Sequence, residues 1–261
     1  MSRRPEPITV IILSRNRPIY LWACLDSLYR FTRFPARFVL VDNQSTDPGV
    51  RDVVAGFERR GLFHAVEWHD HNDPKRVLDA VRRLRDGPGD KIVVIESDVV
   101  VFDTHPCWLT RMQRLMKTNP EVGLLGSYLD TRDFISRAEA RRFMPNARAG
   151  DIDRLIKSKS PERQLTRDPP TEPLIDPFNP PGRLIMARKS VLDDLMFAAD
   201  AMLYEYAREA GVQARIATTV RHRHLSLLNA FDYAEYDTEA RDEFFRLNRK
   251  GVPVRPEDEG S

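Results

Sequence analysis

Two carboxylates separated by one residue stand out in the sequence. Glu96, Ser97 and Asp98 directly follow an apolar run from Ile92 to Ile95. On an extended strand, side chains two residues apart point to the same side, so both carboxylates can face one site. Two anions this close repel each other unless a cation or strong donors lie between them, and oxygen ligands suit Mn²⁺ or Mg²⁺. The alternative is an acidic pair that only ends a buried strand in a solvated loop.

The segments around this pair alternate between strand and helix patterns. Apolar runs predict strands over 8–13, 38–41, 63–68, 92–95, 184–186 and 214–220, and helical spacing predicts helices over 21–28, 50–60, 76–84 and 199–210. This alternation predicts an α/β fold, a mainly parallel sheet with helices on both faces. Such sheets bind ligands beyond the carboxyl ends of their strands. Three of those ends carry polar clusters, which read SRNRP, DNQSTD and ESD.

The remaining segments differ in composition from this pattern. Residues 130–172 are dense in Arg, Asp, Glu and Pro, and we interpret them as an irregular insertion or lid on one domain that covers 1–225. A helical extension is expected over 226–251. The polar, acidic end over 252–261 is expected to be disordered.

Composition excludes several classes of protein. The 41 basic and 39 acidic residues leave a net charge of +2, which argues against a nucleic-acid-binding surface built from bulk charge. Cys24 and Cys107 lie far apart and form no CxxC motif, so neither a disulfide framework nor a structural zinc site is expected, and a reducing, cytosolic setting is the simpler inference. No apolar run approaches the length of a membrane span, and the run over 8–13 is too short for a signal peptide.

Several segments together resemble one enzyme family. ITVIILSRNRPIYLWACLDSL, FVLVDNQSTD and KIVVIESDVVV resemble, in order, the first strand and turn, the second strand and the metal motif of inverting GT-A glycosyltransferases of the family 2 type. GRLIMARKS is similar to the strand before that family's catalytic helix. The resemblance covers about residues 8–103 and resumes at 182–224. It implies a GT-A, Rossmann-like sheet with a variable acceptor-side region, to which we assign 130–172.

The resemblance assigns a nucleotide pocket to the strand ends. Carried over position by position, it comprises Leu13, Ser14, Asn16, Asp42, Arg76 and Ser97. A carboxylate such as Asp42 can accept bonds from a base N–H or from ribose hydroxyls, although an Asx-type turn that holds the loop is the alternative. Arg76 lies where the family approaches the diphosphate, or else on a solvated helix face. Arg17 is expected to brace the loop or a helix end.

The resemblance also supplies candidates for the metal shell and the catalytic base. A histidine of the HRH triplet would complete the shell or contact the diphosphate; His222 and His224 share one side of an extended segment, and His222 is slightly preferred. Asp200 matches the catalytic carboxylate, which would deprotonate the acceptor hydroxyl. The alternative for Asp200 is an acid that stabilises the first turn of a helix. The triplet from His69 to His71 is interpreted as an ordinary polar loop.

The sequence therefore predicts a hexosyltransferase that uses a nucleoside-diphosphate sugar and Mn²⁺ or Mg²⁺. Asp98 would hold the ion, and Glu96 would do so directly or through water because its side chain is one methylene longer than the family's Asp. The acceptor would be a glycan, glycolipid or other hydroxyl compound, in the cytoplasm or peripherally at the inner face of a membrane. Alternatives are a retaining enzyme and a degenerate GT-A domain that binds a glycan or partner. Glycine-rich loops typical of nucleotidyltransferases and dehydrogenases are absent after the first strand.

Overall fold

The structure is a computed structural model, and it describes residues 5–73, 75–130, 137–150, 152, 170–177, 183–194 and 200–225. The predicted helical extension over 226–251 and the predicted tail over 252–261 lie outside the described residues. Most of the predicted insertion over 130–172 also lies outside them, although 137–143 form a short helix.

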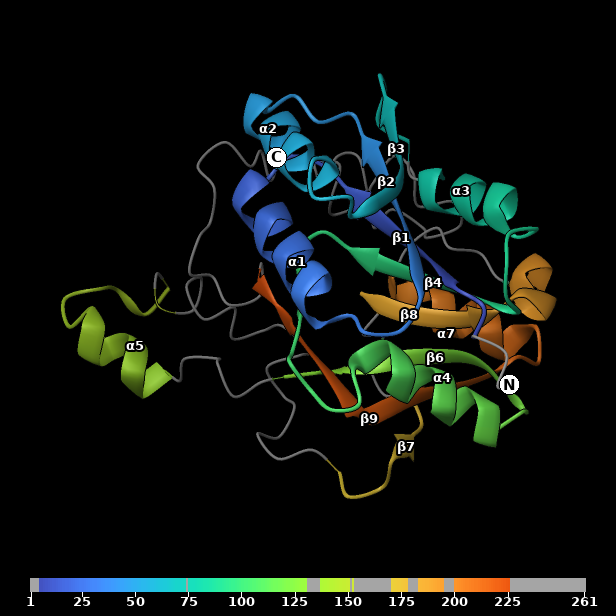
Figure 1. The fold of residues 1–261 in the computed structure, drawn as a ribbon. Coiled ribbons are helices and arrows are strands. Elements are labelled where there is room, and N and C mark those ends of the chain that lie inside the picture. Colours follow the sequence, from blue (N-terminus) through green and yellow to red (C-terminus); the bar gives the residue numbers. More distant parts are fainter. Residues whose placement is uncertain are drawn as a thin grey trace, which may run out of the picture. The chain divides into compact units, whose positions relative to one another are not determined.

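Strands and helices alternate along the first half of the chain, as the sequence predicted (Figure 1). In chain order the elements are β1 (Ile8–Ser14), α1 (Pro18–Phe31), β2 (Ala36–Asn43), α2 (Pro48–Glu58), β3 (Phe63–His69), α3 (Arg76–Leu84), β4 (Lys91–Glu96), β5 (Val99–Val101), α4 (Trp108–Thr118), β6 (Val122–Leu129), α5 (Arg137–Phe143), β7 (Leu174–Ile175), β8 (Leu184–Arg188), the 3-10 helix η2 (Lys189–Asp194), α7 (Asp200–Glu209) and β9 (Gln213–His224).

The strands form one mainly parallel sheet, which confirms the predicted fold class. Their order is β3-β2-β1-β4-β8-β6-β9-β5, and β7 pairs with β9. Strand β1 is parallel to β2 and β4, and β2 is parallel to β3. Strand β8 is antiparallel to both β4 and β6, and β6 is parallel to β9. The carboxyl ends of β1, β2, β3, β4, β6 and β9 therefore share one edge, where such sheets bind ligands.

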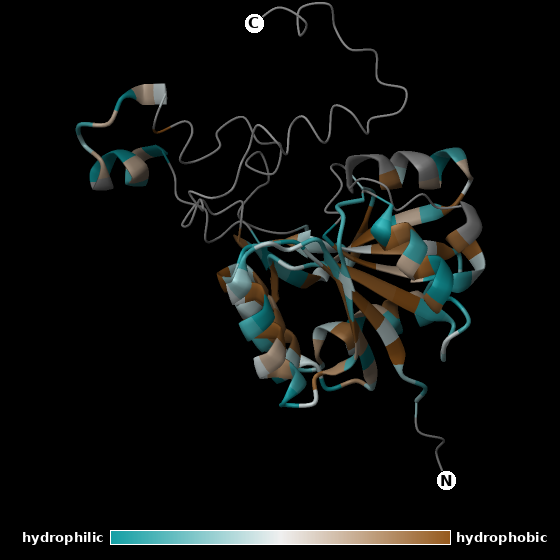
Figure 2. Ribbon diagram, turned by 90° about the horizontal axis from the view of Figure 1, so that it is seen from above, coloured by the Kyte–Doolittle hydropathy of each residue, from teal (hydrophilic) through white to brown (hydrophobic). Residues whose placement is uncertain are grey.

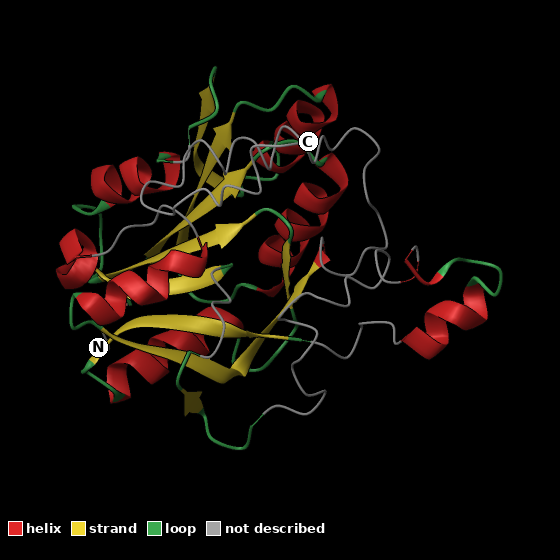
Figure 3. Cartoon of the chain, turned by 180° about the vertical axis from the view of Figure 1, so that it is seen from behind, coloured by secondary structure: helices red, strands yellow, loops and turns green. Residues whose placement is uncertain are grey.

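Helices cover both faces of this sheet (Figures 2 and 3). Val10 and Ile12 of β1 belong to a hydrophobic cluster that includes Leu21 of α1 and buried residues of α2 and α4. Ile11 belongs to a second cluster, with Val81 of α3 and buried residues of α7. Because successive side chains of a strand point to opposite faces, a strand covered on both sides needs an unbroken apolar sequence.

The sequence analysis did not predict β5, α4 or β6. Strand β6 is buried along its whole length, yet it contains Gly123, Gly126 and Ser127, which are poor strand formers. Burial explains Gly123, because a Cβ atom there would lie 2.7 Å from Cγ1 of Val212. Packing of Val212, in the turn between α7 and β9, against the start of β6 therefore requires a residue that the strand pattern disfavours.

None of the helices in the described parts of the chain combines the length and the apolar character that crossing a membrane requires.

Candidate metal and nucleotide site

The three polar clusters of the sequence lie side by side at the carboxyl edge of the sheet. In the strand register, Ser14 is the partner of Asp42 on one side of β1, and Leu13 is the partner of Glu96 on the other. The backbone N–H of Ser97 donates to the carbonyl oxygen of Leu13 at 3.0 Å, which continues this pairing beyond β4. Asp42 and the acidic pair therefore flank the end of the same strand.

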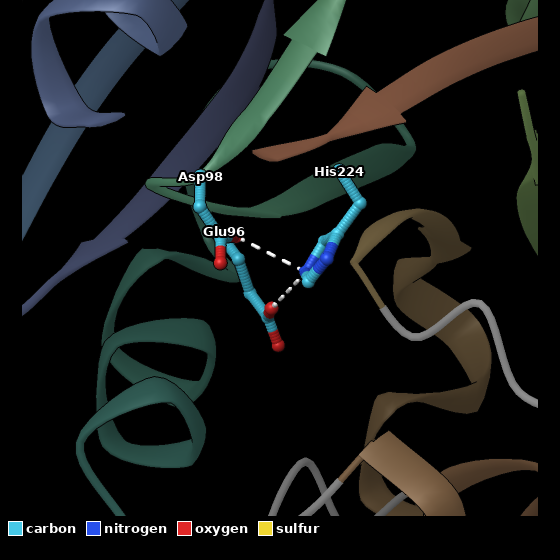
Figure 4. Close-up of side chains that lie close together, drawn as sticks. All are labelled: Glu96, Asp98 and His224. Atoms are coloured by element: carbon cyan, nitrogen blue, oxygen red, sulfur yellow. Dashed lines mark ion pairs between the residues drawn. The ribbon is translucent and has the colours of Figure 1, made fainter. Parts of the chain in front are cut away.

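Glu96, Asp98 and His224 meet in one group, which we call the carboxylate cluster (Figure 4). Strand β9 runs antiparallel to β5 and sets His224 opposite Val99, and the N–H of Leu225 donates to the carbonyl oxygen of Asp98 at 2.9 Å. As a result, Nε2 of His224 lies 3.3 Å from Oδ1 of Asp98 and 3.5 Å from Oε2 of Glu96. One ligand atom from each residue lies within 4.8 Å of the others.

Two arginines contact the same carboxylates. Nη1 of Arg17 lies 3.4 Å from Oδ2 of Asp98, and Nη1 of Arg183 lies 3.2 Å from Oε2 of Glu96. Burial raises the pKa of Asp98, but the positive charges of His224, Arg183 and Arg17 outweigh burial and hold this pKa well below its ordinary value. Burial lowers the pKa of His224, but the neighbouring Asp98 carboxylate raises it, and the net pKa lies above the ordinary 6.5.

The carboxylate cluster fits a divalent cation. Two carboxylates and an imidazole are ligands that Mn²⁺ accepts, and carboxylates with substrate phosphates suit Mg²⁺. Asp98 is 6% exposed, and its buried Oδ1 is contacted by Nε2 of His224 at the long distance of 3.3 Å. A carboxylate oxygen with one long contact keeps lone pairs that a cation can use. Within the described ranges, no other group of three such side chains has this spacing.

His222 occupies a different environment from His224. Its ring is fully buried, and Nδ1 lies 2.7 Å from Oγ of Ser127. Because Ser127 donates to the carbonyl oxygen of Leu184 at 3.2 Å, its Oγ accepts from the Nδ1–H of His222, and Nε2 is then the unprotonated nitrogen. Burial and the positive charges of His224 and Arg183 lower the pKa of His222 to about 3, so the ring is neutral. The structure groups His224, rather than the slightly preferred His222, with the carboxylates.

The loops after β1 and β2 are tied together by side-chain hydrogen bonds, and we call Asn16, Asp42 and Ser45 the loop cluster. Oδ1 of Asn16 accepts from the backbone N–H groups of Thr46 and Asp47, at 2.8 and 3.1 Å. The N–H of Asn16 donates to Oγ of Ser45 at 2.7 Å. Asp42 accepts from both the N–H and the hydroxyl of Ser45, at 2.7 and 2.6 Å. Asp42 thus holds the loop through bonds to the residue three positions on, a loop-holding role like the one that the sequence analysis gave as the alternative; the nucleotide contact stays a prediction.

The loop after β3 is joined to the end of β2 in the same way. Nδ2 of Asn43 donates to Oδ1 of Asn72 at 2.7 Å, and the N–H of Asp73 donates to Oδ1 of Asn43 at 2.9 Å. Gln44, in the left-handed region with φ 64°, donates to the carbonyl oxygen of Asp70 at 2.9 Å. Three loops at the carboxyl edge therefore form one hydrogen-bonded frame.

Other predicted nucleotide residues also lie at this edge. Ser14 is fully buried, and its Oγ has no hydrogen-bond partner among the described residues. Leu13 is partly buried near the end of β1, and Ser97 is partly buried in the turn after β4. Arg76 begins α3, where Nη2 lies 2.5 Å from Nε2 of His71. The triplet from His69 to His71 stays outside the carboxylate cluster, and Nδ1 of His71 lies 2.8 Å from its exposed neighbour Asp70.

The predicted base lies at the start of a helix. Asp200 is the first residue of α7, and its side chain lies outside what the structure describes. Sequence reasoning did not identify the ion pairs of Arg17 and Arg183 with the carboxylates, nor the contact between Ser127 and His222. One feature of the sequence could have pointed to Arg183. It directly precedes the apolar run of the GRLIMARKS segment, and that run forms a strand beside the one that ends at ESD.

The sheet order and the strand-end site define a fold class, the GT-A fold of glycosyltransferases. Particular solved structures share it at low identity. A mannosyltransferase from Pyrobaculum calidifontis, in complex with GDP-Man and Mn²⁺, has a TM-score of 0.54 and 16% identity over 86% of this chain and 58% of its own. TarS from S. aureus has a TM-score of 0.53 and 14% identity over 83% of this chain and 36% of its own.

The alignment with a third similar structure covers most of the length of that structure. Glucosyl-3-phosphoglycerate synthase from Mycobacterium tuberculosis, in complex with Mn²⁺, UDP-glucose and phosphoglyceric acid, has a TM-score of 0.52 and 15% identity, over 96% of this chain and 82% of its own. This chain spans just over half of the mannosyltransferase and about a third of TarS. No family model matches the sequence, and no curated protein matches it. These likenesses establish the fold.

Proposed function

We propose that this protein is a metal-dependent glycosyltransferase that transfers a hexose from a nucleoside-diphosphate sugar to an acceptor hydroxyl. The observation that carries the proposal is the carboxylate cluster at the same sheet edge as Asp42, on a GT-A fold. Two similar solved structures contain Mn²⁺ together with a nucleotide sugar, which supports the same donor class and cofactor here.

The donor nucleotide would lie over the ends of β1 and β2. Ser14 offers a buried hydroxyl without a protein partner in the described part of the chain, directly beside Asp42. Each oxygen of Asp42 accepts one bond from Ser45 and keeps a lone pair for a base N–H or a ribose hydroxyl. Leu13, Asn16 and Ser97 would line the same pocket, with Arg76 toward the diphosphate.

Glu96, Asp98 and His224 would hold a Mn²⁺ or Mg²⁺ ion, with Glu96 bound directly or through water and His222 as the alternative histidine. When bound, such an ion neutralises the charge that develops on the leaving nucleoside diphosphate. The low pKa of Asp98 keeps its carboxylate ionised at neutral pH, so this residue presents negative charge to the ion without first losing a proton.

Asp200 would act as the general base and remove the proton of the acceptor hydroxyl, which gives inversion at the anomeric carbon. Asp200 is the first residue of α7. Residues 130–172 would shape the acceptor side. We place the reaction in the assembly of a glycan or glycolipid, in the cytoplasm or peripherally at the inner face of a membrane.

A thermal-shift screen of nucleoside-diphosphate sugars, with and without Mn²⁺, tests this proposal. A ligand that binds only the folded state raises Tm, so the true donor is expected to raise it, and to do so more with Mn²⁺. Donor hydrolysis or transfer is then followed for that compound, with NMR of the product to assign the anomer. Asp98→Ala should abolish the part of the Tm shift and of the activity that depends on Mn²⁺. Asp103→Ala, which changes an exposed acid outside the cluster, should leave both unchanged.

The proposal fails if no nucleotide sugar shifts Tm at millimolar concentration. Binding of a donor without any turnover would instead support a degenerate GT-A domain. A product with retained anomeric configuration would remove the base role of Asp200 and leave the donor and metal assignments intact.

A further inference from the structure

Two arginines from distant parts of the chain converge on the carboxylate cluster. Arg17 follows β1 and pairs with Asp98 at 3.4 Å; Arg183 precedes β8 and pairs with Glu96 at 3.2 Å. The side chains of Arg17 and Arg183 are only 18% and 21% exposed. Charges in such partly buried positions interact more strongly than charges in bulk water.

These arginines already balance the charge of the two carboxylates. Guanidinium groups stay protonated at any pH relevant to a protein, so Arg17 and Arg183 already carry two positive charges against the two negative ones, before His224 is counted. A divalent ion that entered the carboxylate cluster without a diphosphate would add two more positive charges, and the described carboxylates of the cluster, Asp98 and Glu96, are already paired. Binding of the metal by itself is therefore opposed by the arginines, even though the ligand set suits it.

A diphosphate reverses this balance. It carries two or more negative charges, and guanidinium groups form paired hydrogen bonds with phosphate oxygens. Arg17 is also well placed for this exchange, because it is the N-cap residue of α1, and the N-terminus of a helix favours anions. Its backbone is held in the left-handed region at φ 58° and ψ 60°, next to Asn16, whose side chain is fixed by the loop cluster.

We infer that Arg17 and Arg183 are exchangeable counter-ions that make the binding of metal and diphosphate strongly cooperative. In the free protein they neutralise Asp98 and Glu96 and disfavour the metal alone. When a nucleoside diphosphate binds, both guanidinium groups turn to its phosphates and leave the carboxylates to the ion. This inference rests on the proposed function, and it extends that function to the order in which the ligands load.

The test measures Mn²⁺ binding by EPR on the full chain, alone and with saturating UDP or GDP. In the wild type, one of these nucleotides should tighten Mn²⁺ binding at least about tenfold. Arg17→Gln and Arg183→Gln should each bind Mn²⁺ alone about three- to tenfold more tightly than the wild type, because a competing cation is gone. In the same variants the tightening by nucleotide should shrink by a similar or larger factor.

Matched variants separate this effect from a loss of structure. Arg17→Lys and Arg183→Lys keep the positive charge, so their affinity for Mn²⁺ alone should stay near the wild-type value. Arg33→Gln removes a guanidinium group from an exposed ion pair with Asp103, at 3.3 Å and outside the cluster, and it should change neither quantity. Circular dichroism confirms that each variant is folded.

The outcomes distinguish failure of the inference from failure of the proposed function. If the wild type shows the coupling but both Gln variants bind Mn²⁺ alone no more tightly than it does, the inference is wrong and the function stands. If neither nucleotide alters Mn²⁺ binding by the wild type, the inference falls; should no nucleotide sugar bind either, the proposed function falls with it.

Discussion

The carboxylate cluster and the loop cluster lie on opposite sides of β1 and are stabilised by different forces. In the loop cluster, Asn16, Asp42 and Ser45 satisfy one another and the backbone through short hydrogen bonds. In the carboxylate cluster, Asp98 and Glu96 are compensated by charges from His224 and two arginines, at 3.2 to 3.5 Å. One cluster is held by directional bonds and the other by opposite charges.

The loop cluster is therefore a fixed frame, and the carboxylate cluster is a site whose charged groups can exchange partners. Directional bonds to backbone N–H groups fix the loop conformation and leave little to rearrange when a ligand arrives. Charge pairs tolerate a change of partner, because a metal ion or a phosphate can take the place of a guanidinium group at similar distance. We therefore expect substitutions in the carboxylate cluster to act on metal binding and chemistry, and substitutions in the loop cluster to act on stability and nucleotide binding.

The largest effect is expected at Asp98. Asp98→Ala removes the most buried carboxylate of the cluster, and we expect Mn²⁺ binding to be lost and transfer to fall by at least about 10³-fold. Isothermal titration with Mn²⁺ and a transfer assay measure the two losses. Asp103→Ala serves as the control. If Asp98→Ala kept an activity within tenfold of the wild-type value, the carboxylate cluster would not be the metal site.

His224 should give the next largest effect. His224→Gln removes the imidazole that the structure sets beside both carboxylates, so Mn²⁺ affinity should fall by at least about 10- to 100-fold, the range that loss of an outer-shell partner already causes. His222→Gln is the matched control on the same strand. A larger loss of Mn²⁺ affinity in the His222 variant would exchange the roles of the two histidines.

Much of this arrangement could be predicted from the sequence. Buried parallel strands need continuous apolar runs, so β1, β2 and β4 were recognisable, and so were the polar residues at their ends. Glu96 and Asp98 were found as an acidic pair at the end of an apolar run, but strand alternation does not explain their proximity, because β4 ends at Glu96 and Asp98 lies in the turn before β5. Strand β6 was missed because it contains two glycines and a serine, and at one of them, Gly123, close packing rather than strand propensity selects the residue.

The partners of these residues could not be predicted in the same way. Arg17 and Asp98 are 81 positions apart, and Arg183 and Glu96 are 87 apart, so their pairing depends on the finished sheet order. The two histidines share a strand face, and alternation alone could not choose between them. The choice comes from antiparallel pairing with β5, which sets His224 opposite Val99, next to Asp98 in the chain.

A smaller effect, and of a different kind, is expected in the loop cluster. Asn16→Ala removes two hydrogen bonds to backbone N–H groups and places alanine at φ 51°, so the free energy of unfolding should fall by about 1–2 kcal/mol. Nucleotide affinity should fall by about 5- to 30-fold, while Mn²⁺ binding in the absence of nucleotide stays unchanged. Chemical denaturation and the two titrations measure these quantities.

Asn16→Asp provides the control for that prediction. It keeps an acceptor oxygen at the same position and is tolerated in the left-handed region, so it should restore most of the lost stability. Loss of Mn²⁺ binding in Asn16→Ala would contradict the separation of the two clusters.

The smallest expected effect is a pair of opposite pH trends from two histidines on one strand, measured as Tm in the presence of a chelator. The pKa of His224 is raised above 6.5 by folding, so its charged form adds stability that is fully present below pH 6.5 and is lost as pH rises through the raised value. The Tm of the wild type minus the Tm of His224→Gln should therefore be larger at pH 6 than at pH 9.

His222 should show the reverse trend. Its pKa of about 3 in the folded protein means that the unfolded chain takes up a proton near pH 6.5 that the buried ring refuses, so the wild type loses stability as pH falls below that value. His222→Gln lacks this proton uptake, so its Tm should rise relative to the Tm of the wild type as pH falls from 7 to 5. If the Tm difference from the wild type changed in the same direction for both variants as pH falls, the two rings would not differ in charge. The assignment of His224 as charged and paired and of His222 as neutral would then be wrong.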